Sequence, residues 1–177
     1  MTAPLQNLAA GCRNGSVTQL GTTLIAIHIL AAVLWVGGAS FLLFVVVPAG
    51  RSTMPLSERA LYFRRLDRAF DSIVYIAIAV LFLSGLLQWL GSGLGVEQRN
   101  QDLLGLKILL MLGMLGLRLL RSSNKGPELA RLAAETIGQG NAARPEPLEI
   151  AWKANVRFLM LEVLLAIPVI FLSVLIG

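Results

Sequence analysis

A few polar or metal-binding side chains occur inside long apolar stretches of this chain. His28 is the only histidine, and Trp35 follows it by two helical turns. Lys107, Met111 and Met114 recur at intervals of four and three residues, so on a helix they share one face. Imidazole and thioether groups bind copper, and both also ligate haem iron. The sequence therefore predicts a copper site at His28, Met111 and Met114, or a haem b site at His28 with Lys107 and Trp35 as further cofactor-binding residues.

Each of these residues also has a plainer interpretation. A lone histidine can bond a main-chain carbonyl one turn away, and methionines often fill gaps in an apolar core. A lysine inside a membrane is costly and for that reason a functional candidate, but close to a helix end its long stem reaches the headgroups. From the sequence alone, copper, haem and no cofactor all stay open.

The composition indicates an integral membrane protein. Hydrophobic residues make up 56% of the 177 residues, charged residues only 14%, and the mean hydropathy is +0.74. The net charge of +5 does not indicate nucleic-acid binding, because the basic residues fall between apolar runs, where they act as topology signals and lipid contacts. The single cysteine, Cys12, excludes an internal disulfide and a multi-cysteine metal cluster.

Four apolar runs are long enough to cross a bilayer of roughly 30 Å. They cover residues of about 20–48, 70–90, 103–120 and 154–176. A polar segment, residues 1–19, precedes them, and a loop at 121–153 contains a short surface helix in its PELARLAAETI portion. The fold class predicted is all-α: one membrane domain, residues 20–176, folded as an up-and-down four-helix transmembrane bundle in a lipid bilayer.

One face of the first span is predicted to point into the bundle. This face comprises His28, Ala31, Ala32, Trp35, Ala39 and Leu42.

Basic residues are distributed unevenly between the connections. The connection after the first span carries five, Arg51, Arg59, Arg64, Arg65 and Arg68, and the third connection and its flanks carry seven, Arg118, Arg121, Lys125, Arg131, Arg144, Lys153 and Arg157. The other side has only Arg13 and Arg99. The positive-inside rule therefore predicts that both basic connections, the loop 121–153 included, are cytoplasmic and that both termini are outside.

Two acidic residues lie in or near the apolar runs. Asp71 is predicted to form an ion pair or a headgroup contact at the membrane interface, one turn from Asp67 and Arg68. Glu162, inside the last span, is expected to pair with Arg157 or Arg118 rather than to carry protons.

Three stretches carry a resemblance to a known family. They read FRRLDRAFDSIVYIAIAVLFLSGLLQWL, DLLGLKILLMLGMLGLRLLR and VRFLMLEVLLAIPVIFLSVLIG. Together they resemble the copper resistance D (CopD) domain: a basic helix leading into a span, a third span opening with Leu-x-x-Lys, and a last span with a buried glutamate. The first span is also similar to that of HemJ-type membrane protoporphyrinogen oxidase, which implies roles in haem binding and activity for His28 and Lys107.

The resemblance implies a protein that handles or transports copper across the cytoplasmic membrane, the inner membrane of a bacterium. The first alternative is a haem b-binding redox protein, HemJ-like or an electron-transfer subunit. The second is a cofactor-free subunit of a larger membrane complex or a homo-oligomer. A non-enzymatic role is favoured, and an enzyme would be an oxidoreductase of the HemJ type. With one histidine, two-histidine haem ligation within one chain is excluded.

Overall fold

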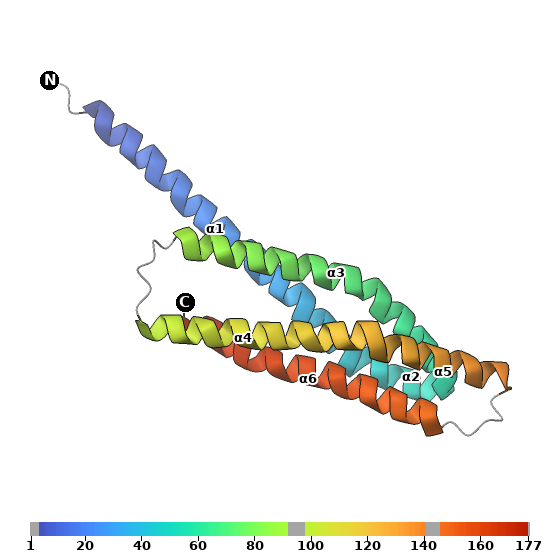
Figure 1. The fold of residues 1–177 in the computed structure, drawn as a ribbon. Coiled ribbons are helices and arrows are strands. Elements are labelled where there is room, and N and C mark those ends of the chain that lie inside the picture. The colour runs from blue at the N-terminus through green and yellow to red at the C-terminus, as the bar shows by residue number, and fades with distance from the viewer. Residues whose placement is uncertain (1–3, 92–97, 141–145, 177) are drawn as a thin grey trace.

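The computed structural model describes residues 4–91, 98–140 and 146–176, and in these ranges the chain is helical almost throughout. The elements are α1 (Pro4–Phe41), η1 (Leu42–Val46), α2 (Val47–Thr53), α3 (Leu56–Gly91), α4 (Gln98–Leu120), η2 (Arg121–Lys125), α5 (Gly126–Gly138) and α6 (Glu146–Ile176). Four long helices pack together, as the apolar runs predict, and the all-α bundle is confirmed (Figure 1).

The long helices pack as two pairs. Helix α1 lies along α3, and α4 lies along α6, while α5 packs against both α3 and α6 (Figure 1). One end of the bundle carries α2, α5 and the start of α6, and is called the basic end below. The other end carries the end of α3, the start of α4 and the C-terminus of α6, and is called the terminal end.

Each long helical segment is apolar and long enough to cross a membrane. The four candidate spans are Gly21–Thr53, Leu56–Gln88, Leu103–Gly138 and Glu146–Leu175. Large apolar side chains point outward from them, and Ile76, Leu109 and Phe171 are each 66% exposed. In a bilayer such side chains contact the acyl chains of lipids, so the chain is a multi-pass membrane protein.

The first long helix extends beyond the predicted span at both ends. Helix α1 already begins at Pro4, so most of the predicted polar segment is helical, and the chain stays helical past Pro48 to Thr53. Proline lacks the N–H of a helical bond, and its ring clashes with the carbonyl four residues earlier. Here that carbonyl, of Phe44, lies in the wide π-helical turn η1, where bonds run over five residues, as from Val47 N–H to Leu42 O.

The predicted loop 121–153 is wrong in its first half, because α4 continues through η2 into α5 without a break. Pro127, at the start of α5, is accommodated in the same way as Pro48, because the residue four before it, Ser123, lies in the π-helical turn η2. The predicted short helix exists, but Leu129 and Ala133 are fully buried against the bundle. Part of the remaining loop, 141–145, lies outside the described residues.

Two apolar clusters form the core. The first, at the basic end, includes Phe63, Leu129 and Trp152. The second lies nearer the terminal end and includes Trp35 and Met114. The predicted inward face of the first span is confirmed at four positions, since the exposed fraction is 5% for Ala31, 2% for Trp35, 1% for Ala39 and 4% for Leu42.

Candidate functional site

His28 lies half-buried on α1, and a hydrogen bond to α3 fixes its ring. Its Nδ1 is 2.8 Å from Ser84 Oγ. The one proton of the Ser84 hydroxyl is donated to the carbonyl of Val80, at 2.6 Å. With its proton directed to the main chain, the hydroxyl oxygen can accept a hydrogen bond from Nδ1–H of His28, and in that tautomer Nε2 carries the lone pair. An imidazole oriented in this way is prepared to bind a metal ion or accept a proton through Nε2.

The His28 ring packs closely on α3 and has a positively charged neighbour. A Cβ on Gly85 would lie 3.5 Å from His28 Cε1, so the ring packs on the bare backbone of α3. Lys107, half-buried on α4, lies within electrostatic range of His28. The ammonium and the imidazole are therefore in one region near the terminal end.

The other predicted site residues lie deeper along the same helices. Met114 is buried in the apolar cluster that contains Ala31 and Trp35, and Met111, one turn nearer the terminal end, packs against this cluster. Met114 thus lies in the interior of the bundle, and Met111 borders the same apolar cluster. Among the described residues, no three His, Cys, Asp or Glu side chains are grouped so as to hold a metal ion. A metal at His28 would therefore need softer or external ligands in addition.

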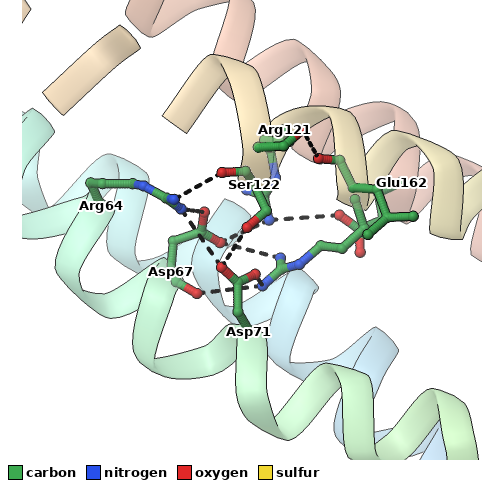
Figure 2. A network of polar contacts seen from close by, with 9 residues as sticks. Arg64, Asp67, Asp71, Arg121, Ser122 and Glu162 are labelled. Atoms are coloured by element: carbon green, nitrogen blue, oxygen red, sulfur yellow. Dashed lines mark hydrogen bonds and ion pairs between the residues drawn. The ribbon is translucent and has the colours of Figure 1, made fainter. Parts of the chain in front are cut away.

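A second polar region is buried toward the basic end, and it joins residues that the sequence analysis considered separately, among them Asp71 and Glu162. Figure 2 shows it as a set of charged side chains from α3, the α4–η2 segment and α6. We call it the ion-pair network: Arg64, Asp67, Asp71, Arg118, Arg121 and Glu162. Three guanidinium groups and three carboxylates make its formal charge zero, which offsets much of the cost of burying so many ions.

Asp67 is the centre of the ion-pair network. Its Oδ1 lies 2.8 Å from Arg121 Nη2 and 3.2 Å from Arg118 Nη1, and its Oδ2 lies 3.2 Å from Arg64 Nη1. The side chains of Asp67, Arg118 and Arg121 are at most 1% exposed. One carboxylate of α3 therefore ties down two arginines from the α4–η2 segment.

Asp71 forms the ion pair that its position predicts, but with other partners and in a buried place. Its Oδ1 is 2.6 Å from Arg118 Nη2, and its Oδ2 accepts a hydrogen bond of 2.8 Å from the Ser122 hydroxyl.

The partner predicted for Glu162, Arg157 or Arg118, is wrong. Glu162 Oε2 lies 3.7 Å from Arg121, and Oε1 accepts a 2.9 Å hydrogen bond from the indole Nε1–H of Trp35. Trp35 thereby connects the network to α1.

Glycines let the arginines approach the helix backbones. A Cβ on Gly126, the first residue of α5, would lie 2.5 Å from Arg64 Cζ, so the guanidinium rests on that backbone. The ring of Phe70 packs directly on Gly38 of α1, and the Arg118 guanidinium lies 5.5 Å from the centre of this ring. Small residues at helix contacts thus position the charged ones.

The two regions offer different chemistry. Every charge of the ion-pair network has an opposite charge within 4 Å, and the network joins α3, α4, η2 and α6, so it suits a structural or positioning role. His28 uses Nδ1 for the bond to Ser84 and has a cationic neighbour in Lys107, so it suits binding of a metal ion through Nε2 or of an anionic cofactor. A sequence signal for the network did exist: Arg64, Asp67 and Asp71 recur at helical spacing, as do Arg118 and Arg121.

No protein-family model, curated protein or solved structure matches this chain. Its length, its composition and its four packed helices establish a multi-pass four-helix membrane protein.

Proposed function

We propose that this chain handles copper at the terminal end of the bundle, with His28 as the principal ligand. The observation that carries the proposal is the hydrogen bond between His28 Nδ1 and Ser84, which holds the ring on α3 and, with Nδ1 protonated, leaves the Nε2 lone pair to bind a metal ion. Met111 is the candidate thioether, because it packs beside the cluster that contains Ala31, the residue one turn from His28, and it lies one turn nearer the terminal end than Met114. Imidazole and thioether together suit Cu(I).

The proposal is for copper binding on one side rather than passage through the bundle. Toward the basic end lies the ion-pair network, whose carboxylates are already paired with guanidinium groups and which offers no soft ligand to Cu(I). The other two methionines with described side chains, Met54 and Met160, are 38% and 44% exposed and point away from the interior. A chain of soft ligands across the membrane is therefore missing among the described side chains.

Copper titration of the purified chain tests the proposal. Cu(I) affinity is measured by competition with a chromophoric chelator in detergent. His28→Ala and Met111→Leu are expected to weaken binding, and Ser84→Ala is expected to cost about 10- to 100-fold by releasing the ring. Met160→Leu is the matched control, because it removes an exposed thioether on α6. Equal affinities in all four variants would reject the site.

A second candidate is a haem b-binding redox protein with His28 as axial ligand. The observation that favours it is Lys107, which lies within electrostatic range of His28 and is suited to pair with a propionate as a point charge. Haem reconstitution separates the two functions: a Soret band lost in His28→Ala and weakened in Lys107→Met supports haem, and Cu(I) binding without a Soret band supports copper. Neither signal would leave a cofactor-free subunit of a larger membrane complex.

The proposed setting is the cytoplasmic membrane of a bacterium, with the basic end inside and both termini outside. The support is the excess of arginine and lysine in the connections at the basic end. Cysteine labelling with a membrane-impermeant reagent tests this orientation. In a Cys12→Ser background, which removes the chain's own cysteine, a cysteine at the exposed Glu135 should be shielded in intact cells, and one at Gly177 should react.

A further inference from the structure

A pocket at the basic end is independent of both the His28 region and the ion-pair network. It has a volume of about 380 Å³ and lies between the end of α2, the start of α3 and the start of α6. Its charged lining consists of Arg51, Arg59, Lys153, Arg157 and Glu149. Four positive charges thus face one negative charge, which Lys153 Nζ already contacts at 2.7 Å.

The arginines of this pocket lack carboxylate partners. Among the described residues, no ion pair is formed by Arg51, Arg59 or Arg157. Arg59 and Arg51 lie within electrostatic range of each other, so they repel. The Nε of Arg59 is buried and has no hydrogen-bond acceptor among the described residues. An anion in this pocket would relieve the repulsion and supply the acceptor that Arg59 lacks.

One wall of the pocket is apolar and rigid. Trp152 is 5% exposed and packs edge-on against Phe63, with ring centres 5.4 Å apart. The Arg59 guanidinium lies 4.9 Å from the centre of the Trp152 ring. The stem of Arg59 packs on Gly50, where a Cβ would lie 2.8 Å from its Cγ and Cδ. Arg59 is therefore held in place by Gly50 along its stem and by the Trp152 ring beside its guanidinium group.

The depth of the pocket matches the lipid headgroups. On α6 the residues after Arg157, from Phe158 to Ile176, contain one charge, Glu162. Such a stretch rises about 28 Å at 1.5 Å per residue, close to the thickness of the hydrocarbon core. Arg157 and Lys153 hence lie within two turns outside that core, where phosphates and glycerol groups are found. An amphipathic lipid fits a pocket that combines guanidinium groups with a tryptophan wall.

From this geometry we infer that the pocket binds the phosphate of an anionic phospholipid, with Arg59 and Arg157 as its main contacts. The lipid phosphodiester accepts hydrogen bonds from the guanidinium groups, and its glycerol backbone lies against Trp152. Arg51 and Lys153 add attraction for a headgroup with net negative charge. A zwitterionic lipid is bound less well, because its ammonium group meets the same basic side chains.

Native mass spectrometry of the full chain, released from micelles titrated with phosphatidylglycerol, tests the inference. Arg59→Gln and Arg157→Gln should each weaken the first lipid-binding event about fivefold. Arg65→Gln, which removes an exposed arginine of α3 outside the pocket, should leave that event unchanged. Arg157 is itself exposed, so its variant is expected to fold even if Arg59→Gln does not.

Three outcomes would overturn the inference. The first is equal affinity for phosphatidylcholine and phosphatidylglycerol. The second is an equal loss in Arg65→Gln, which would indicate general attraction to a basic surface. The third is displacement of the lipid by inorganic phosphate at an equal concentration, which would make the ligand a soluble phosphate compound instead.

Discussion

Replacing Asp67 by asparagine should destabilise the bundle far more than breaking an exposed ion pair of the same length. Asp67 and Arg121 are 2.8 Å apart with both side chains 1% exposed. Arg131 and Glu135 on α5 are also 2.8 Å apart, but their side chains are 65% and 49% exposed. The two ion pairs therefore have the same N–O distance and differ in how far their side chains are exposed to solvent.

The expected difference follows from solvent screening. Two unit charges about 4 Å apart attract by about 1 kcal/mol in water and about 4 kcal/mol at the effective dielectric constant of ~20 found for protein sites. Asp67→Asn also leaves three buried guanidinium groups facing two carboxylates. We expect a loss of about 3–5 kcal/mol in the free energy of unfolding. Glu135→Gln should cost about 0.3–0.5 kcal/mol, as exposed pairs at this spacing do.

The free energy of unfolding is measured by steric trapping in bicelles for both variants. The double variant Asp67→Asn with Arg121→Met restores the charge balance and should recover part of the loss, giving a coupling energy that the single variants lack. An Asp67→Asn chain no less stable than the Glu135→Gln chain would refute the assignment of Asp67 as the buried centre of the network.

Three further substitutions test how the network is built, all read by the same unfolding measurement. Gly126→Ala should lower the free energy of unfolding by about 1–3 kcal/mol, because the new Cβ displaces Arg64 from its hydrogen bonds. Gly113→Ala is the control and should be neutral, because no atom lies near its added Cβ. Equal effects of the two variants would contradict the contact between Arg64 and Gly126. Trp35→Phe removes the donor to Glu162 and should cost about 1.5–3 kcal/mol; an unchanged stability would show that this bond is not formed. Gly38→Leu would overlap the aromatic ring packed on it and should cost about 1–3 kcal/mol, and a stable variant would argue against that close contact.

The architecture could be predicted from the sequence because hydropathy and helical periodicity act locally. Apolar runs of sufficient length define membrane helices, and a stripe such as Ala31, Trp35 and Ala39 must face a neighbour. The ends of the helices were predicted less well. Pro48 and the polar stretch at 121–125 normally indicate a helix end, but a wide turn before each proline keeps the helix intact.

The ion-pair network was only partly predictable, because partner choice depends on how helices pack. The spacing of charged residues on α3 and α4 indicates that they share a helix face, but not which face of which helix they meet. Glu162 illustrates this: Arg157 and Arg118 are near it in sequence or in predicted depth, yet Arg121 and Trp35 are its contacts. The orientation of His28 likewise depends on Ser84, which is 56 residues away in the chain.

The two π-helical turns have a consequence for insertions and deletions. Each wide turn accommodates one residue more than a regular helix would need, so removing one residue from 42–46 or 121–125 leaves a chain that can still form a continuous α-helix. Because the wide turn already absorbs the extra residue, such a deletion would leave the helix beyond it close to its present orientation. In the second case Leu129 and Ala133 would still face α3 and α6. The cost would instead fall at Pro48 or Pro127, because the proline ring would then clash with a carbonyl four residues earlier in regular α-helical geometry. A single-codon loss there should therefore kink the helix at the proline, which length-variant genetics could detect.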